Sequence, residues 1–357
     1  MNQRQAFEAT VRHEPHDAFL FYAKFTPDVE ARLMDRAGIR DRADIRAAFG
    51  MFDPVPAYLR PTGPARPRDL ERYYEGIDRP PGSRINNLGV LCIPTGHYHF
   101  HREVPPLRHA TCLSDLEAFP FWDLSDHTDA FMADDVRIAR ETGRVSFCAL
   151  GSIYEGAWQL RGYEDFLSDL LLEPAMCEFL MDRLTDLWVD LARKAALAGV
   201  DLLTCGDDVA SQQTLMFPPE TWRHFIKSRW ARVFEAARSV RPDIQIKYHS
   251  DGNVTEILPE LIDIGVTILN PVQPECMDLA FLEREYGHRL VFDGTIGTQT
   301  TLPFGTPAEI RETVRLRKRT LGQNGGLVLA PTHIVEPEVP LDNVLAFLDA
   351  CREGEEA

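Results

Sequence analysis

The chain has 357 residues, of which 44% are apolar and 26% are charged. This composition excludes a disordered chain, and no run reaches the ~18 consecutive apolar residues that a membrane-spanning helix needs. Lys and Arg total 38 against 55 Asp and Glu, a formal net charge of −17, so we expect no binding to nucleic acid or to anionic membranes.

The seven cysteines are odd in number and include no C-x-x-C pair. This usage favours reduced thiols and a cytoplasmic location. The first residues, MNQRQAFEATVRHEPHD, lack the apolar segment of a signal peptide, which agrees with that expectation.

The first part of the chain gives weak structural signals. Residues 1–17 are predicted to form a short helix and a turn, and the apolar run 19–22 is the first candidate strand. A helix is predicted over 26–38, because Pro27 stands in its first turn and Gly38 at its end.

Long irregular connections are predicted over 52–67 and 77–86, which are rich in proline, glycine and arginine. Residues 88–93 form a short apolar run that predicts a strand. The following GHYHFH segment (96–101) has three histidines at alternating positions. These would share one face of a strand, either as a metal motif or as a solvated edge.

From residue 144 onward, apolar strands alternate with amphipathic helices. The predicted strands are 144–151, 200–208, 244–252, 266–273, 289–297 and 325–333. The predicted helices are 163–199, 218–240, 253–265, 277–287, 306–322 and 340–353.

This alternation is typical of parallel βα units, whose strands are continuous apolar runs because helices cover the sheet. Six units follow residue 144 and two more fit before it. We therefore predict an α/β fold, a single (β/α)8 TIM barrel over 1–357 with N-terminal helical and loop additions. Residues 1–144 would be its irregular part and 145–352 its regular part. An open doubly wound sheet is the alternative, weakened by the lack of a G-x-G-x-x-G segment after an early strand.

Polar residues cluster where the predicted strands end. In a barrel these ends share one mouth, where chemistry takes place. As catalytic acids or bases we select Glu155, Asp207 and Asp208. Adjacent residues on a strand point to opposite faces, so one aspartate of the pair is expected in the mouth. The substrate-binding candidates are Tyr154, Asn270, Gln273 and Asp293.

Three further residues predict a metal site. His249 and Asp251 are two positions apart at a strand end, so both side chains lie on one side of the chain, and His333 follows the last strand. Two imidazoles and a carboxylate suit zinc or another divalent metal, with a fourth position open to substrate. The alternative is that His249 and Asp251 only form hydrogen bonds within their loop.

Several segments resemble the uroporphyrinogen decarboxylase superfamily. They are YHSDGNVTEILPELIDIGVTILNPVQ, RLVFDGTIGTQTTLPFGTP, GGLVLAPTHIVEPEVPLDNVLAF and GDDVASQQTLMFPPETWRHFIK. The resemblance covers roughly residues 145–352 and implies a (β/α)8 barrel. The family's M-R-Q-A-G-R segment, whose arginines bind tetrapyrrole carboxylates, has no match in FLFYAKFTPDVEARL. Uroporphyrinogen itself is therefore not expected as the substrate.

The chain is more similar to the corrinoid-linked methyltransferase branch, whose zinc motif is H-x-C followed by a distant cysteine. His249 matches the histidine, while Asp251 and His333 stand where the thiolates would be. Such harder ligands make a stronger Lewis acid, suited to a substrate oxygen or nitrogen.

The resemblance implies a metal-dependent methyltransferase or demethylase. It would move a methyl group from a small methoxy or methylamine-type compound to a corrinoid carried by a separate partner protein. A homodimer is among the states that the resemblance allows. The alternatives are a decarboxylase or lyase acting on a small carboxylic acid, and a barrel that binds without catalysis.

Overall fold

The computed structural model describes residues 1–64, 68–96 and 100–353. Eight strands form one sheet, in the order β1-β13-β12-β11-β10-β9-β8-β2, and every pair in it is parallel. The strands are β1 (Leu20–Phe21), β2 (Val55–Pro56), β8 (Ser146–Ala149), β9 (Leu202–Gly206), β10 (Gln245–His249), β11 (Ile268–Asn270), β12 (Val291–Asp293) and β13 (Leu327–Leu329).

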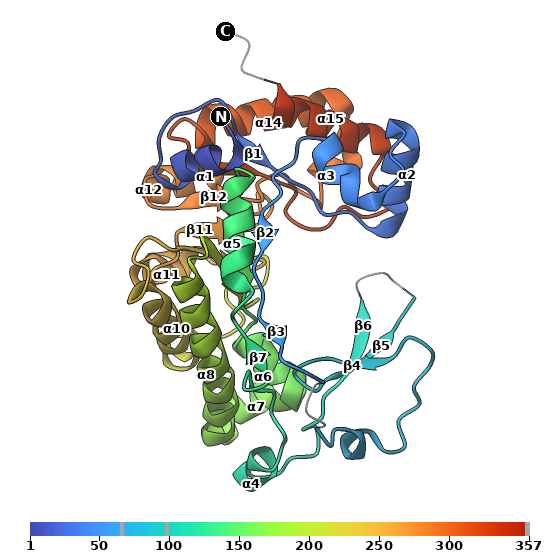
Figure 1. Ribbon diagram of the computed structural model, residues 1–357, viewed down its shortest axis with the longest axis vertical. Helices are drawn as coiled ribbons and strands as arrows, with labels where there is room; N and C mark the ends of the chain where they lie inside the picture. Colours follow the sequence, from blue (N-terminus) through green and yellow to red (C-terminus); the bar gives the residue numbers. More distant parts are fainter. Residues whose placement is uncertain (65–67, 97–99, 354–357) are drawn as a thin grey trace.

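This sheet curls into the predicted α/β barrel. Its two outer strands are joined by a hydrogen bond from the Phe52 N–H to the Phe21 carbonyl, 2.7 Å long, so the edges meet. Helices surround the sheet, and the excursion that carries β4 to β6 stands to one side of it (Figure 1).

The longer helices connect the barrel strands or cover its ends. They are α1 (Gln3–Val11), α2 (Pro27–Ala37), α5 (Met132–Glu141), α6 (Tyr154–Arg161), α7 (Tyr163–Leu172), α8 (Pro174–Ala198), α10 (Ser228–Arg238), α11 (Leu258–Ile264), α12 (Leu279–Tyr286), α14 (Pro307–Leu321) and α15 (Leu341–Arg352). The shorter ones are α3 (Ile45–Ala48), α4 (Leu113–Glu117), α9 (Pro219–Trp222) and α13 (Thr301–Phe304).

Local signals explain several of these boundaries. Helix α2 begins at Pro27 and ends before Gly38, which has a φ of 67°, as predicted from a proline start and a glycine stop. The predicted helix 163–199 is instead two helices, since Pro174 has no N–H to continue the hydrogen bonds of α7 and starts α8.

The second barrel strand differs from the prediction. The run 88–93 lies outside the barrel, where β5 (Leu91–Pro94) pairs antiparallel with β4 (Arg84–Ile85) and β6 (His101–Val104). A separate antiparallel pair joins β3 (Arg60–Pro61) to β7 (His127–Thr128). The barrel uses β2, in a segment predicted to be irregular.

Strand β2 is hidden from sequence periodicity because it has two residues, one of them proline. Its pairing with β8 uses the flanking alternate amides. The Val55 N–H donates to the Val145 carbonyl at 2.7 Å, and the Ala57 N–H donates to Phe147 at 2.8 Å. Pro56 stands between these donors, where the ladder needs no N–H.

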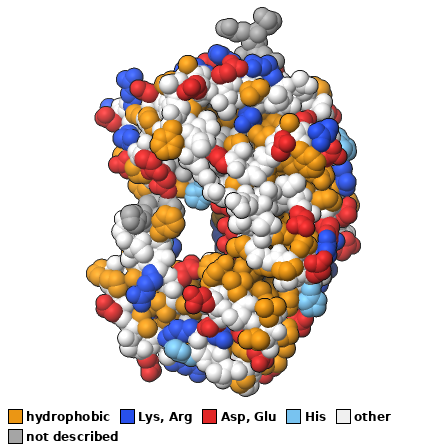
Figure 2. Space-filling view, turned by 180° about the vertical axis from the view of Figure 1, so that it is seen from behind, with side chains coloured by type: hydrophobic (Ala, Val, Ile, Leu, Met, Phe, Trp, Pro, Cys, Tyr) orange, Lys and Arg blue, Asp and Glu red, His pale blue; other side chains and the backbone are white. Residues whose placement is uncertain are grey.

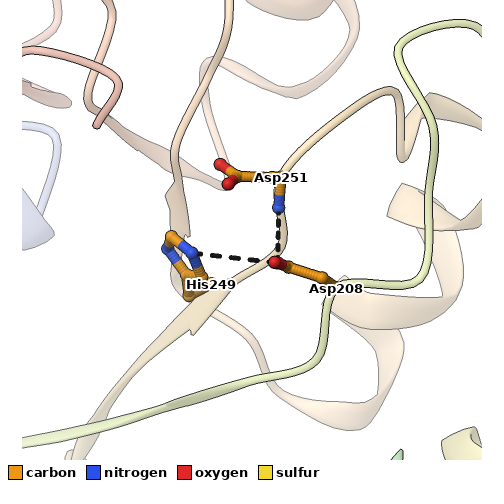
Figure 3. A group of neighbouring side chains, drawn as sticks. All are labelled: Asp208, His249 and Asp251. Carbon is orange, nitrogen blue, oxygen red and sulfur yellow. Dashed lines mark hydrogen bonds and ion pairs between the residues drawn. The ribbon is translucent and has the colours of Figure 1, made fainter. Parts of the chain in front are cut away.

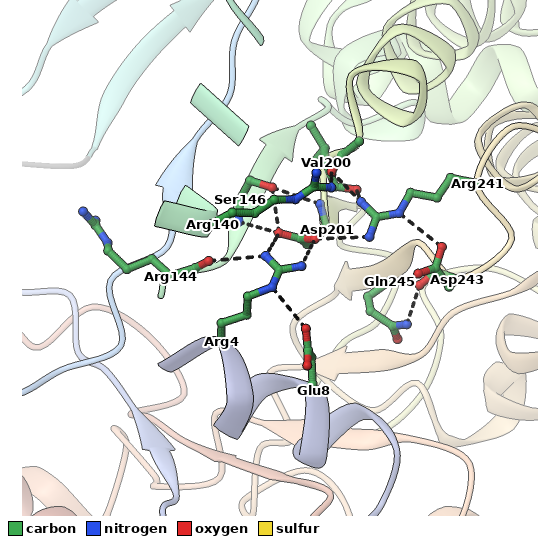
Figure 4. A network of polar contacts seen from close by, with 11 residues as sticks. Arg4, Glu8, Arg140, Arg144, Ser146, Val200, Asp201, Arg241, Asp243 and Gln245 are labelled. Carbon is green, nitrogen blue, oxygen red and sulfur yellow. Dashed lines mark hydrogen bonds and ion pairs between the residues drawn. The ribbon is translucent and has the colours of Figure 1, made fainter. Parts of the chain in front are cut away.

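The N-terminal helix α1 closes the barrel end opposite the mouth. Phe7 packs with Phe52, Leu202, Ile268 and other buried side chains in a cluster at that end. Arg4 donates two hydrogen bonds of 2.9 Å to the buried Asp201 carboxylate, which also accepts from Ser146 and Arg241 (Figure 4). No helix within the described ranges is both long and apolar enough to span a membrane.

Candidate functional site

The carboxyl ends of β9, β10 and β11 bring the central part of the site together. His249 lies beside Gly206 on one neighbouring strand and beside Asn270 on the other. A Cβ at Gly206 would stand 2.0 Å from the His249 carbonyl oxygen, so only glycine permits this approach of the two strands. Gly252, with a φ of 85°, turns the chain directly after Asp251.

Asp208, His249 and Asp251 form one compact group at the mouth (Figure 3). Each offers a ligand atom, and these atoms lie within 4.8 Å of one another. His249 Nε2 is 3.8 Å from Asp208 Oδ1, which accepts a 2.8 Å hydrogen bond from the Asp251 N–H. Gln273 Nε2 donates to Asp251 Oδ1 at 3.3 Å and so holds the second carboxylate.

The orientation of the His249 ring is fixed from behind by Asn270. The Asn270 amide nitrogen donates to Asp293 Oδ1 at 3.1 Å, so its oxygen is left to face His249 Nδ1 at 2.7 Å. His249 Nδ1 must therefore carry the proton, and Nε2 presents its lone pair toward Asp208.

A buried cation stands behind Asn270. Lys247 forms an ion pair with Asp293 and donates to the Tyr22 hydroxyl at 2.9 Å. Burial alone would lower the pKa of Lys247, but the Asp293 carboxylate reverses this and holds the pKa above its usual value. Lys247 therefore stays charged and neutralises Asp293, which in turn orients Asn270.

Burial and neighbouring negative charge raise the pKa values of Glu155 and Asp251 at the mouth. Burial, followed by the charges of Asp207 and Asp208, raises the pKa of Glu155 to about 8. Burial also raises the pKa of Asp251, and the charge of Asp208 adds to this while His249 and His333 oppose it. Glu155 Oε2 accepts a hydrogen bond from the Asp208 N–H at 3.3 Å, so a protonatable acid borders the three-residue group.

Asp207 has a different position from Asp208. It is fully buried, and its oxygens accept from the N–H groups of Ile153 and Glu155 at 3.0 Å and from Trp230 Nε1 at 2.7 Å. Burial raises its pKa to about 7 despite these donors. Asp207 thus ties the start of α6 to β9 and α10, with both oxygens already occupied.

Tyr154, predicted to bind substrate, is placed in the core. Its ring is fully buried in edge contact with Phe166 and Phe217, and it does not line the mouth cavity described below. Gln273 is also buried and supports the site through Asp251 and the Gly252 N–H.

The remaining histidine predictions fall in three places. His333 is exposed and stands outside the three-residue group, although its charge reaches Asp251. His97 and His99 lie outside the described residues. His101 is exposed on β6, in the sheet beside the barrel.

A cavity of about 560 Å³ opens from the site into the barrel. Figure 2 shows the molecule from behind, hollowed between its two ends. Strands β8 and β9 contribute small side chains to the wall, Ala149, Thr204 and Gly206, which leaves the space free. Among the predicted residues, Glu155, His249, Asn270 and Asp293 line it.

The sequence reasoning missed the cationic residues of this cavity and a tyrosine beside them. They are Tyr22, Lys24, Arg46 and Lys247. Lys247 alternates with His249 on β10, so the same period of two that selected His249 and Asp251 places it on the inner face. Nothing in the local sequence of Arg46 indicates its position.

The comparisons with known proteins agree with this architecture. The sequence profile described as uroporphyrinogen decarboxylase (URO-D) matches residues 103–354, more than half of the chain. The chain belongs to the uroporphyrinogen decarboxylase family. No curated protein matches it.

Among solved structures, a methyltransferase from Methanosarcina mazei superposes on this family member with a TM-score of 0.63, at 22% identity and over 98% of each chain. At this identity the likeness shows a shared fold. A B12-independent methionine synthase from Shewanella sp. W3-18-1, in complex with selenomethionine, gives a TM-score of 0.41 at 15% identity, over 62% of this chain and 65% of the other. That score is too low to carry a functional argument.

Proposed function

We propose that the protein is a metal-dependent methyltransferase that demethylates a small methoxy or methylamine-type compound, with a separate corrinoid protein as methyl acceptor. The observation that carries this proposal is the group of Asp208, His249 and Asp251 beside a cavity of about 560 Å³ that His249 and Glu155 line. Membership of the family and the methyltransferase fold of the Methanosarcina mazei structure support the reaction class.

The residues present fit a divalent cation. Two carboxylates at close range need a positive charge between them, and His249 is held with Nε2 free to bind. Three protein ligands of nitrogen and oxygen type are characteristic of catalytic zinc sites and related divalent metals. We propose Asp208, His249 and Asp251 as the ligands, and His333 stays a further candidate.

When bound, the metal would supply Lewis acidity to the heteroatom that carries the methyl group. Glu155 supplies the proton. With a pKa of about 8 it is mostly protonated at neutral pH, and it borders the metal ligands through Asp208. The acceptor forms a bond to the methyl carbon while the bond between that carbon and the heteroatom breaks. The heteroatom keeps the electron pair of the broken bond and takes the proton of Glu155.

The experiment measures bound metal by elemental mass spectrometry in the wild type, His249→Ala and the control His224→Ala. His224 is exposed and paired with Glu178 on the outer surface. We expect about one equivalent in the wild type and the control, and none in His249→Ala. Methyl transfer from methoxy compounds to a corrinoid protein is then assayed. Absence of metal from the wild type after incubation with zinc would reject the site.

A second candidate is decarboxylation of a small carboxylic acid. Glu155 favours it, because a carboxyl protonated near neutral pH can also donate to a carbanion. Release of CO₂ without transfer of a methyl group would select this reaction over the first.

A further inference from the structure

The cavity is lined by positive charge, and Lys24 and Arg46 belong to the part of the barrel around β1, which lies across the sheet from β10 and His249. Lys24, Arg46 and Lys247 all line it, whereas the chain as a whole has a formal charge of −17. Lys247 is neutralised by Asp293. Arg46 Nη1 stands 3.2 Å from Asp53, but that carboxylate also pairs with Arg144, so it serves two guanidinium groups.

Lys24 has no counter-ion of its own. Within residues 1–64, 68–96 and 100–353, neither a hydrogen bond nor an ion pair reaches its side chain. It follows β1 at the barrel mouth and lines both the 560 Å³ cavity and a neighbouring cavity of about 740 Å³. Arg46 also lines both, so the two cations share one space.

The electrostatics agree with an unmatched positive charge at this point. Burial lowers the pKa of Lys24, and the charges of Lys247 and Arg46 lower it further, while the Asp293 carboxylate, already paired with Lys247, opposes them in part. An anion placed beside Lys24 and Arg46 would relieve this repulsion. Because Asp53 already balances part of the charge, a singly charged carboxylate matches the excess better than a doubly charged phosphate.

The walls between the two ends of the cavity are apolar. Phe52, Pro54, Phe147 and Leu150 line it, and His249 and Glu155 belong to its acidic, metal-binding end. A ligand that fits has a carboxylate at one end, an apolar or aromatic middle, and a heteroatom at the other end.

We infer that Lys24 and Arg46 form a carboxylate-binding subsite that selects anionic methyl donors. The subsite orients the substrate so that its methylated heteroatom faces Asp208, His249 and Asp251. This inference rests on the proposed function for the methylated heteroatom and its position at Asp208, His249 and Asp251, whereas binding of a carboxylate at Lys24 and Arg46 does not depend on methyl transfer.

The test compares 4-methoxybenzoate with its uncharged analogue 4-methoxybenzamide, by calorimetric titration of the purified full chain. The wild type should bind the acid more tightly than the amide. Lys24→Met should weaken binding of the acid roughly tenfold to a hundredfold, the range for loss of a charge-assisted hydrogen bond. Binding of the amide should not change, and Lys24→Arg should retain most of the preference.

Lys194→Met is the matched control, because Lys194 pairs with Asp190 on the outside of α8. It should bind both compounds as the wild type does. His249→Ala separates this inference from the proposed function: that variant should lose metal but keep the preference for the acid. Equal binding of acid and amide by the wild type, binding of neither at millimolar concentration, or an unchanged preference in Lys24→Met would overturn the subsite.

Discussion

The two ends of strand β9 carry aspartates in opposite electrostatic settings. Asp201 precedes the strand and accepts hydrogen bonds from Arg4, Arg241 and Ser146. Burial would raise its pKa, but Arg4 and Ser146 outweigh burial and lower it. Asp208 follows the strand at the mouth, beside Glu155 and Asp251, whose pKa values are raised. Opposite charges surround the aspartate at one end of the strand, whereas like charges lie close together at the other.

The largest effect should follow removal of the buried carboxylate. Asp201→Ala leaves Arg4 and Arg241 without their partner and should lower the free energy of unfolding by about 3 kcal/mol. Chemical denaturation measures this difference. Metal content should not change, because the mouth lies at the other end of the strand. Unaltered stability would show that α1 is not anchored by this contact.

The contributions of Glu155 and Asp201 to the free energy of unfolding should change with pH in opposite directions. The folded state holds the Glu155 proton up to a pKa of about 8, against an ordinary value of 4.5, so wild-type stability falls as pH rises between these values. Glu155→Gln should therefore gain stability over the wild type at pH 8 and little at pH 5.

For Asp201, with its lowered pKa, stability is present above the ordinary pKa and is lost as pH falls through the folded one. Denaturation of Asp201→Asn and the wild type along the same pH series checks this. The loss of stability in Asp201→Asn relative to the wild type should become smaller in acid. The gain of stability in Glu155→Gln should also be small there. A Glu155→Gln benefit independent of pH would contradict the raised pKa.

Asn270 should affect metal affinity more than folding. Asn270→Ala frees the His249 ring and removes the acceptor at Nδ1, so metal should bind about tenfold more weakly. Competition with a chromophoric chelator gives the affinity. A matched Asn253→Ala variant changes a polar contact to Gln213 outside this group and should bind metal as the wild type does.

The smallest effect on stability is expected at the mouth itself. Asp208→Asn preserves the shape and the acceptor for the Asp251 N–H, and it relieves repulsion between carboxylates. The free energy of unfolding should stay within about 0.5 kcal/mol of the wild type, while bound metal should be lost. A large loss of stability would place Asp208 in the same structural class as Asp201.

The sequence was sufficient for features that repeat locally. The βα alternation after residue 144 predicts the barrel, and the strand ends place His249 and Asp251 at its mouth. The sequence offered His333 as their third partner and Asp208 as an acid or base, whereas Asp208 stands in the group of three and His333 outside it. Asp207 could not be separated from Asp208 by spacing alone, because its role depends on Trp230 and the start of α6. Strand β2 was missed because two residues show no period.

The cationic side of the cavity was beyond local reasoning. Lys24, Arg46 and Lys247 come from distant parts of the chain, and no cluster of basic residues marks them. They meet only because the barrel closes. A histidine motif can be recognised within a few residues, whereas a charge shared across a cavity is visible only in three dimensions.

The pairing of β1 with β13 has a consequence for synthesis of the chain. Leu20 lies opposite Val328 in this pair, so the first strand lacks its partner on this side until nearly the whole polypeptide has left the ribosome. Contacts between such distant segments form late and slowly. Lys24, which follows β1, can thus face His249 only after this last step. A nascent chain ending before β13 would lack a working pocket even with every proposed metal ligand already made.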